Sequence, residues 1–188
     1  LFWPDSEEAQ ARTNLRRELH NLRKQLPQAE LYLRVGSRTV QWLPDAPYSL
    51  DVNAFEEAAD QAESVSDDED AVVEATQAAV RLYSGDLLPA CYDEWLTVER
   101  ERLQSRAIAM LERLADLLET QRRYAAALPH AHRLLAIEPL REESFLRLMR
   151  LQALNGDRTA ALQTYHRCAA LLDSELGVTP GAAIEALK

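Results

Sequence analysis

One pattern is written twice between residues 111 and 168, as LERLADLLETQRRYAAALPHAHRLLAIEPL (111–140) and then as FLRLMRLQALNGDRTAALQTYHRC (145–168). The small residues Ala127 and Ala161 stand 34 positions apart, and large apolar residues precede each of them at matching spacings. A period of this length is typical of an array of helix–turn–helix units. Small residues allow the helices of one hairpin to approach closely, and large ones fill the space between hairpins. The pattern therefore predicts stacked antiparallel helical hairpins.

The two copies resemble tetratricopeptide (TPR) repeats, although neither is perfect. The matching positions are Leu111, Leu114, Ala115, Leu118, Tyr124, Ala127 and Pro139 in the first copy and Phe145, Leu148, Gly156, Ala161 and Tyr165 in the second. Arg122 stands where a glycine would make the turn, and Pro129 falls inside the second helix, where it should bend the helix. An ordinary antiparallel bundle with a chance period is the alternative. Either way the fold class is mainly α, which leaves the function open.

Length and composition narrow the class of protein. The chain has 188 residues, 47% of them hydrophobic, and it has no run of 18 apolar residues that could span a membrane. It starts with LFWPD, without an initiator Met or the pattern of a signal peptide, so we interpret it as a fragment of a longer protein. Two distant cysteines, Cys91 and Cys168, do not make a disulfide framework. We expect free thiols in a reducing cytoplasm.

The net charge of −10 conceals a split along the chain. Residues 1–44 hold 7 basic and 5 acidic side chains, whereas the remaining 144 residues hold 14 basic and 26 acidic ones. Within 12–42 the balance is 7 to 2. An asymmetry of this kind suggests that the first segment meets an anion that the rest of the chain does not meet.

The basic segment reads as a helix followed by a hairpin. Leucines at 15, 19, 22 and 26 form one apolar stripe of a helix that ends at Pro27, and the residues off the stripe are types that reach phosphates and base edges. Two short strands, 31–35 and 38–42, then flank Gly36-Ser37, which suits a two-residue turn with positive φ at the glycine. A basic helix followed by such a hairpin ends a winged helix. A solvated basic face and a hairpin packed on the helical domain are the alternatives.

Pro44 to Pro47 marks a boundary, which divides the chain into 1–44 and 45–188. In the second part we expect helices at about 52–64 (capped by Asp51) and 70–84 (with Gly85 as C-cap). After Leu96 a long helix should run through 99–102 to about 121. Helices near 124–138, 141–155 and 158–175 should follow, with a short one starting at Thr179-Pro180. The inward residues of the first two are expected to be Val52, Phe55, Ala59 and Ala62, then Val73, Ala79, Val80, Leu82 and Tyr83. Tyr92, Trp95 and Leu96 should be buried, because such a cluster is more often core than a ligand site.

Several motifs are similar to those of one family of regulators. They are LFWPD (1–5), NLRRELHNLRK (14–24), DVNAFE (51–56), LYSGDLLP (82–89), WLTVERERL (95–103), PLREE (139–143) and ELGVTP (175–180). In this order and spacing they resemble SARP-type regulators (antibiotic regulatory proteins), in which an OmpR-type winged helix is followed by a bacterial transcriptional activator domain. The resemblance covers essentially the whole chain.

The resemblance implies a DNA-binding transcriptional activator. Its winged helix would bind promoter DNA, and its TPR-like domain would support a homodimer and contact RNA polymerase or another protein partner. The recognition helix would be about 7–26 and the wing about 31–42. The candidate DNA-binding residues are Arg12, Asn14, Arg16, Arg17, His20, Asn21, Arg23, Lys24, Arg34 and Arg38. The earlier part of the winged helix would precede Leu1, so we expect weak DNA binding by this chain alone.

No constellation in the sequence indicates an enzyme. There is no glycine-rich phosphate loop and no serine or cysteine nucleophile motif. His130 and His132 are two apart on a helix and point differently, as do His166 and Cys168. We therefore expect no catalytic residues, no metal, no cofactor and no membrane partner. The alternative function is a TPR-type interaction module without DNA binding of its own, with a concave groove for a peptide or a small effector.

Overall fold

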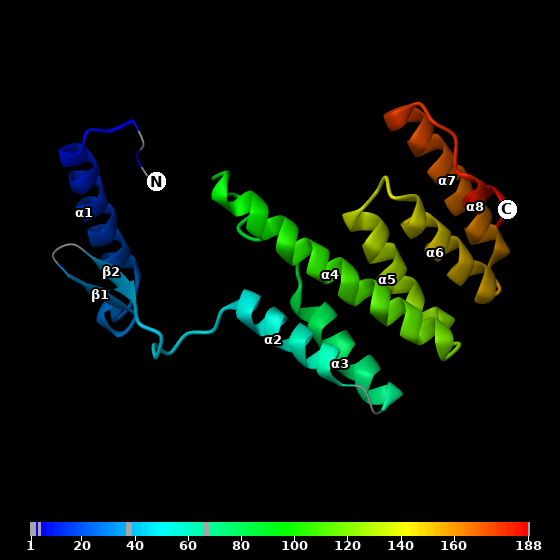
Figure 1. Cartoon of the computed structure of the whole chain (residues 1–188), viewed down its shortest axis with the longest axis horizontal. Coiled ribbons are helices and arrows are strands. Elements are labelled where there is room, and N and C mark those ends of the chain that lie inside the picture. The colour runs from blue at the N-terminus through cyan, green and yellow to red at the C-terminus, as the bar shows by residue number, and fades with distance from the viewer. Residues whose placement is uncertain (1–2, 4, 37–38, 66–67, 188) are drawn as a thin grey trace. The chain divides into compact units, whose positions relative to one another are not determined.

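The computed structural model describes residue 3 and residues 5–36, 39–65 and 68–187. The chain divides into two compact units, Leu1–Ser49 and Leu50–Lys188 (Figure 1). No helix in the described part of the chain combines the length and the apolar character that crossing a bilayer requires.

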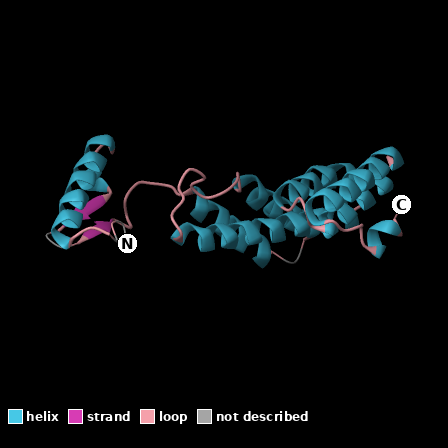
Figure 2. Cartoon of the chain, turned by 90° about the horizontal axis from the view of Figure 1, so that it is seen from above, coloured by secondary structure: helices cyan, strands magenta, loops and turns pink. Residues whose placement is uncertain are grey.

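The N-terminal unit holds one long helix and one hairpin. Helix α1 (Glu8–Gln25) is followed by a single 3-10 turn, η1 (Ala29–Leu31), and by the antiparallel strands β1 (Leu33–Val35) and β2 (Val40–Trp42). Figure 2 shows these strands in magenta and everything else regular as helix. Gln28 links α1 to η1 with a left-handed backbone at φ 55°. The helix and hairpin expected from the sequence are both present.

The predicted two-residue turn at Gly36-Ser37 is wrong. Val35 lies opposite Val40, so four residues separate the paired ends of the strands. Gly36 does not have a positive φ, and its N–H donates to the carbonyl of Thr39 at 2.8 Å. Ser37 and Arg38 lie outside the described residues.

The second unit is a row of helices that pack in chain order. It contains α2 (Asp51–Ser64), α3 (Glu69–Leu82), α4 (Trp95–Thr120), α5 (Tyr124–Ile137), α6 (Glu142–Leu154), α7 (Arg158–Leu176) and the short α8 (Ala182–Glu185). Each long helix packs chiefly on the helix before and after it, which produces successive antiparallel hairpins (Figure 1). The mainly α, TPR-like fold predicted from the period is confirmed.

The predicted inter-helix residues form the core of this unit. Ala127 is fully buried and Ala161 is 8% exposed, and Leu111, Leu114, Phe145 and Leu148 are each at most 1% exposed. The equivalent turns of the two repeats also match. Arg122 (φ 57°) and Gly156 (φ 88°) both have a left-handed backbone after α4 and α6. An arginine therefore adopts the conformation that favours glycine.

Some local predictions in this unit are wrong. Asp51 is the first residue of α2 instead of its cap, although its carboxylate accepts a hydrogen bond from the N–H of Val52 at 2.9 Å. Leu82 is 41% exposed, because α3 ends there and the chain turns away. Gly85 lies beyond the C-cap of α3, which is Tyr83. The last helix begins at Ala182, with Gly181 as its N-cap instead of Thr179.

Candidate nucleic-acid interface

The polar face of α1 carries the sequence-predicted DNA-binding residues in two rows. Residues at spacings of three and four lie on one face of a helix. One row therefore contains Arg12, Arg16, His20 and Arg23, and the second contains Asn14, Arg17, Asn21 and Lys24. All eight side chains are exposed except that of Asn14, which is half-buried. The helix thus presents cations beside amides, the combination that suits phosphates and base edges.

Two of these arginines have acidic neighbours on the same helix. Arg12 pairs with Glu8 one turn away, and Arg17 pairs with Glu18 at 3.1 Å. Both partners in each pair are more than half exposed. Exposed pairs contribute about 0–1 kcal/mol. A phosphate could therefore replace either carboxylate at little cost.

The apolar stripe of α1 is not covered within the described residues. The helix has no buried residue; Leu15 and Leu22 are 39% and 42% exposed, and Leu19 is half-buried. Soluble helices normally bury such a stripe.

The hairpin has its own small apolar cluster. Trp42 lies 5.2 Å from Tyr48 in an edge-on arrangement and 6.0 Å from Tyr32, measured between ring centroids. Leu33 is buried, and Arg34, next to it on β1, is exposed. The structure therefore directs Arg34 to solvent on the hairpin, whereas Arg38, the other predicted wing residue, lies outside the described residues.

The titratable groups described in the helical unit do not gather into a metal site. In the described part of the chain no three His, Cys, Asp or Glu side chains gather in a way that could hold a metal ion. Burial, aided by Arg133, lowers the pKa of His130, so this histidine is neutral at pH 7. Burial raises the pKa of Cys168 to about 11, with a smaller effect from Glu142. The Cys168 thiol is therefore protonated and unreactive.

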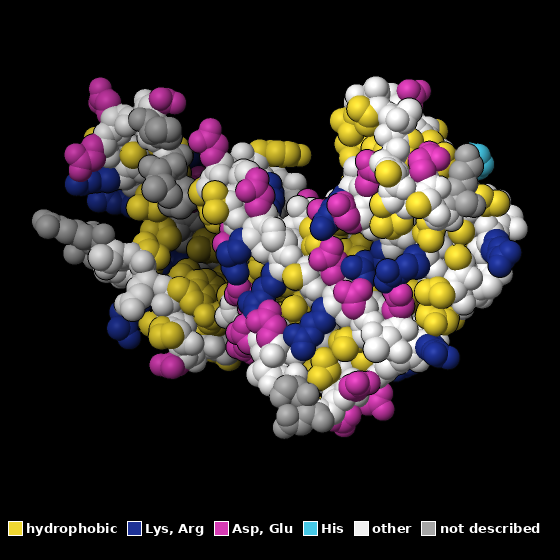
Figure 3. Space-filling model, turned by 45° about the vertical axis from the view of Figure 1, so that its right-hand side comes forward, with side chains coloured by type: hydrophobic (Ala, Val, Ile, Leu, Met, Phe, Trp, Pro, Cys, Tyr) yellow, Lys and Arg dark blue, Asp and Glu magenta, His cyan; other side chains and the backbone are white. Residues whose placement is uncertain are grey.

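Ion pairs on the surface of the helical unit connect alternate helices. Arg102 pairs with Glu56 and Arg106 with Asp60, which joins α4 to α2. Arg141, Arg147 and Arg150 pair with Glu112, Asp116 and Glu119, which joins α6 and the residue before it to α4. The space-filling view shows basic and acidic side chains interleaved instead of gathered by sign (Figure 3). The surface is therefore polar along these helices.

The segment between α3 and α4 is held by one arginine. Arg100 donates from Nε to the carbonyl of Leu87 at 2.7 Å and from Nη2 to the carbonyl of Cys91 at 2.6 Å. It also donates to the carbonyl of Leu88, which has a left-handed backbone at φ 46°. A guanidinium that binds three carbonyls fixes the path of this segment. Sequence reasoning missed this role, since nothing near Arg100 in the sequence indicates it.

The predicted burial of Tyr92 and Trp95 is wrong. Leu96 is fully buried, but Tyr92 is 90% exposed and Trp95 is 56% exposed. The segment held by Arg100 carries Tyr92 away from the core, and Trp95, about 100° around the helix from Leu96, lies outside the buried face of α4. Local composition suggested core because aromatic residues usually are core.

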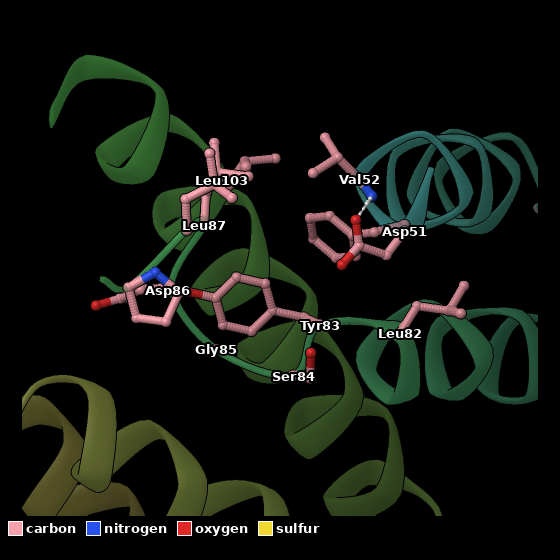
Figure 4. Close-up of a pocket in the computed structure, with 12 residues that line it drawn as sticks. Asp51, Val52, Leu82, Tyr83, Ser84, Gly85, Asp86, Leu87 and Leu103 are labelled. Atoms are coloured by element: carbon pink, nitrogen blue, oxygen red, sulfur yellow. Dashed lines mark hydrogen bonds between the residues drawn. The ribbon is translucent and has the colours of Figure 1, made fainter. Parts of the chain in front are cut away.

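A cavity of about 450 Å³ lies beside this segment. Val52 from α2 and Leu103 from α4 point toward one another across it, with Tyr83, Asp86 and Leu87 from the segment between (Figure 4). Burial, together with the nearby charge of Asp86, raises the pKa of Tyr83, so its hydroxyl stays protonated. The charged residues that line the cavity are Asp51 and Asp86.

The stacked helical hairpins of the second unit define a class of helical repeat domain, which serves many roles. Residues 50–188 match the family model of the bacterial transcriptional activator domain, and the chain belongs to this family. The family comprises regulators and is not enzymatic.

Two solved structures are similar in fold. EmbR from Mycobacterium tuberculosis, in complex with a low affinity phosphopeptide, is 21% identical and covers 98% of this chain with a TM-score of 0.62. This chain spans half (50%) of that chain. The C-terminal TPR-containing domain of a Plasmodium falciparum protein described as FK506-binding is 14% identical, with a TM-score of 0.49, over 75% of this chain and 91% of that one. The search of curated proteins found no match.

Proposed function

We propose that this chain is part of a cytoplasmic, DNA-binding transcriptional activator. Residues 1–44 form the C-terminal part of a winged helix, with α1 as recognition helix and the β1–β2 hairpin as wing. Residues 45–188 form the activator domain, which contacts RNA polymerase or another protein and supports a homodimer. The observation that carries the proposal is the pair of exposed polar rows on α1, directly followed by a hairpin with Arg34 at its surface.

The leucine stripe of α1 fits the same proposal. A recognition helix must pack one face on its own domain while the opposite face enters the major groove. The stripe of Leu15, Leu19, Leu22 and Leu26 supplies the first face. Of the two rows, the one that begins at Asn14 lies opposite the stripe and the one that begins at Arg12 lies beside it. We propose that the stripe packs on an earlier part of the winged helix, and that α1 is held firmly enough to bind DNA tightly only when that part is present.

Fluorescence anisotropy with DNA from the upstream region of the gene tests the proposal. The 188-residue chain and a form extended at its N-terminus are titrated at several salt concentrations. We expect the extended form to bind tightly at low salt. The logarithm of its binding constant should fall linearly with the logarithm of the salt concentration, with a slope of roughly 0.9 for each phosphate contacted. The chain by itself should bind weakly.

Substitutions identify the surface. Arg16→Ala, Arg23→Ala and Arg34→Ala in the extended form should each weaken binding and flatten the salt slope, whereas Arg81→Ala, an exposed arginine of α3, should leave both unchanged. If neither form binds above the non-specific level, the basic face of α1 is a solvated surface. The better account is then a TPR-type interaction module without DNA binding, which the exposed Tyr92 and Trp95 favour.

A further inference from the structure

The three most exposed large apolar side chains among the described residues of the helical unit lie close together in the sequence. Between residues 88 and 98, Tyr92 is 90% exposed, Val98 72%, Trp95 56% and Leu88 53%. Isolated exposed apolar residues are ordinary, but a group that includes two aromatic residues is typical of an interaction site. We call Leu88, Tyr92, Trp95 and Val98 the aromatic surface.

This surface is ordered before any partner arrives. Arg100 donates to the carbonyls of Leu87, Leu88 and Cys91. These contacts fix the backbone of Leu88 and the backbone next to Tyr92. Trp95 and Val98 lie one turn apart on α4 itself. Binding to side chains on fixed backbone loses less conformational entropy than binding to a flexible loop. The left-handed backbone at Leu88 is a strained conformation, and such strain concentrates at functional sites.

One side of this end of α4 is left uncovered by α5. α4 has 26 residues, whereas α5, which packs antiparallel against it, has 14. The N-terminal turns of α4 therefore extend past the end of α5 (Figure 1). In these turns Leu96 and Leu103 face the core, while Val98 lies opposite to them and Trp95 lies beside them, outside the buried face.

The charge around the aromatic surface selects the kind of partner. Residues 85–102 contain five acidic side chains, Asp86, Asp93, Glu94, Glu99 and Glu101, and two basic ones, Arg100 and Arg102, of which Arg102 pairs with Glu99. The guanidinium of Arg100 is bound to backbone carbonyls. An acidic surface repels nucleic acid and attracts a basic partner.

The cavity beside this surface can receive a side chain. Leu88 belongs to the aromatic surface and also lines the cavity of about 450 Å³. Its walls include Val52, Phe55 and Leu103, and its charged residues, Asp51 and Asp86, are both acidic. An apolar side chain with lysine or arginine on either side fits such a site.

We propose that the aromatic surface and this cavity bind a basic amphipathic helix of a partner protein. One apolar side chain of that helix enters the cavity, others lie on Tyr92 and Trp95, and its lysines and arginines pair with the surrounding carboxylates. Helix binding of this kind uses apolar anchors at spacings of three and four. The inference rests on the proposed role of the helical unit in protein contacts and specifies the surface and the partner chemistry.

The test uses a labelled 16-residue peptide of leucine and lysine, with leucines at helical spacing, and the same peptide with glutamate in place of lysine. Fluorescence anisotropy with the full chain should show binding of the lysine peptide only. Tyr92→Ala and Trp95→Ala should each weaken binding by about tenfold or more, as expected for aromatic anchors. Leu176→Ala, a leucine 55% exposed at the end of α7, is the matched control and should bind as the parent does.

A second pair of variants tests the charge. Glu94→Gln should weaken binding of the lysine peptide by roughly threefold and reduce its salt dependence, whereas Glu175→Gln, an exposed carboxylate on α7, should not. Circular dichroism confirms that each variant is folded. Equal binding of both peptides, or equal binding by the Trp95→Ala and Leu176→Ala variants, contradicts the proposal.

Two further measurements distinguish peptide binding at this surface from dimer formation and from the proposed DNA binding. If Trp95→Ala turns a dimer into a monomer in sedimentation and the peptide does not bind, the surface joins two copies of the chain and the proposal fails. The DNA titration is run on the same extended variants, and Tyr92→Ala and Trp95→Ala should retain DNA binding. If no form binds DNA but the peptide still binds in a way that depends on Trp95, the DNA-binding proposal is wrong and the proposal for the aromatic surface is supported.

Discussion

Helices α1 and α4 both carry a regular apolar stripe, but only α4 buries it. α1 has 18 residues and none of them is buried, whereas eight of the 26 residues of α4 are buried. Leu15 and Leu22 on α1 are 39% and 42% exposed, while Leu111 and Leu114 on α4 are 1% and 0% exposed. Periodicity identifies the face of a helix that can be buried. Burial itself depends on the elements that the rest of the fold supplies.

The two helices also have different functional consequences. A helix that α3 and α5 hold on two sides is a rigid scaffold, on which Trp95 and Val98 can be displayed. Burying a leucine side chain fully is worth about 1.5–3 kcal/mol, and α1 does not gain this from its four leucines within the described residues. We therefore expect the helical unit to be the more stable of the two, and α1 to gain stability from whatever covers its stripe.

The largest expected effect contrasts one leucine from each helix. Leu114→Ala should lower the free energy of unfolding of the helical unit by about 3 kcal/mol, since it leaves a cavity in a packed core. Leu22→Ala should lower that of the N-terminal unit by less than about 1 kcal/mol, because the side chain is already partly in water. Hydrogen exchange measures opening in each unit separately. Equal losses would mean that α1 is packed in solution.

A smaller effect contrasts two arginines. Arg133 on α5 donates to the carbonyl of Val80 at 2.7 Å and to that of Tyr83, and its guanidinium lies 5.8 Å from the Tyr83 ring centre. It thus binds the last carbonyls of α3 across two hairpins. Arg133→Met should cost about 1–3 kcal/mol, because partly buried carbonyls lose their donors. Arg17→Met on α1 should change stability by less than about 0.5 kcal/mol. Urea unfolding followed by circular dichroism measures both.

Most of the fold was predictable because its signals are local. The 34-residue period identified the small residues Ala127 and Ala161, and helical spacing separated the two polar rows from the leucine stripe of α1. The exposed positions of Tyr92 and Trp95 were not predictable in this way. They depend on Arg100 binding carbonyls 9 to 13 residues away, an interaction that no local pattern encodes. The DNA-binding role of the α1 rows stays a prediction.

A further contrast concerns left-handed backbone, which both units place on residues other than glycine. Arg122 and Gln28 have φ values of 57° and 55°. This conformation costs a residue other than glycine roughly 1–2 kcal/mol. Replacing the residue by glycine removes that cost, but it loses about 0.5–1 kcal/mol because glycine is more flexible in the unfolded chain. Arg122→Gly and Gln28→Gly should therefore each stabilise their own unit by up to about 1 kcal/mol.

Replacing Gly156, which occupies the position equivalent to Arg122, should change stability in the opposite direction. Gly156 has φ 88° in the turn that matches Arg122, so Gly156→Ala should destabilise the helical unit by about 1–2 kcal/mol. Gly156→Asn should cost less, because asparagine tolerates this backbone. Urea midpoints compare the variants. A stabilising Gly156→Ala would show that the turn relaxes to another conformation and that the two repeats are not equivalent there.

The smallest expected effect on stability concerns exposed ion pairs, and it also separates the functions of the two units. Arg12 pairs with Glu8 on α1, and Arg150 on α6 pairs with Glu119 on α4. Because both arginines are more than half exposed, Arg12→Ala and Arg150→Ala should each change the free energy of unfolding by less than about 1 kcal/mol, and less still in high salt.

Their effects on DNA binding should differ. Arg12 lies in a row where its guanidinium can exchange Glu8 for a phosphate, so Arg12→Ala should weaken DNA binding by the extended form and reduce the salt slope by about one. Arg150 lies among the ion pairs of the helical unit, so Arg150→Ala should leave DNA binding unchanged. Anisotropy titrations of both variants, alongside their urea midpoints, make the comparison. Equal losses of DNA binding would place the helical unit on the DNA and remove the division of roles between α1 and the helical hairpins.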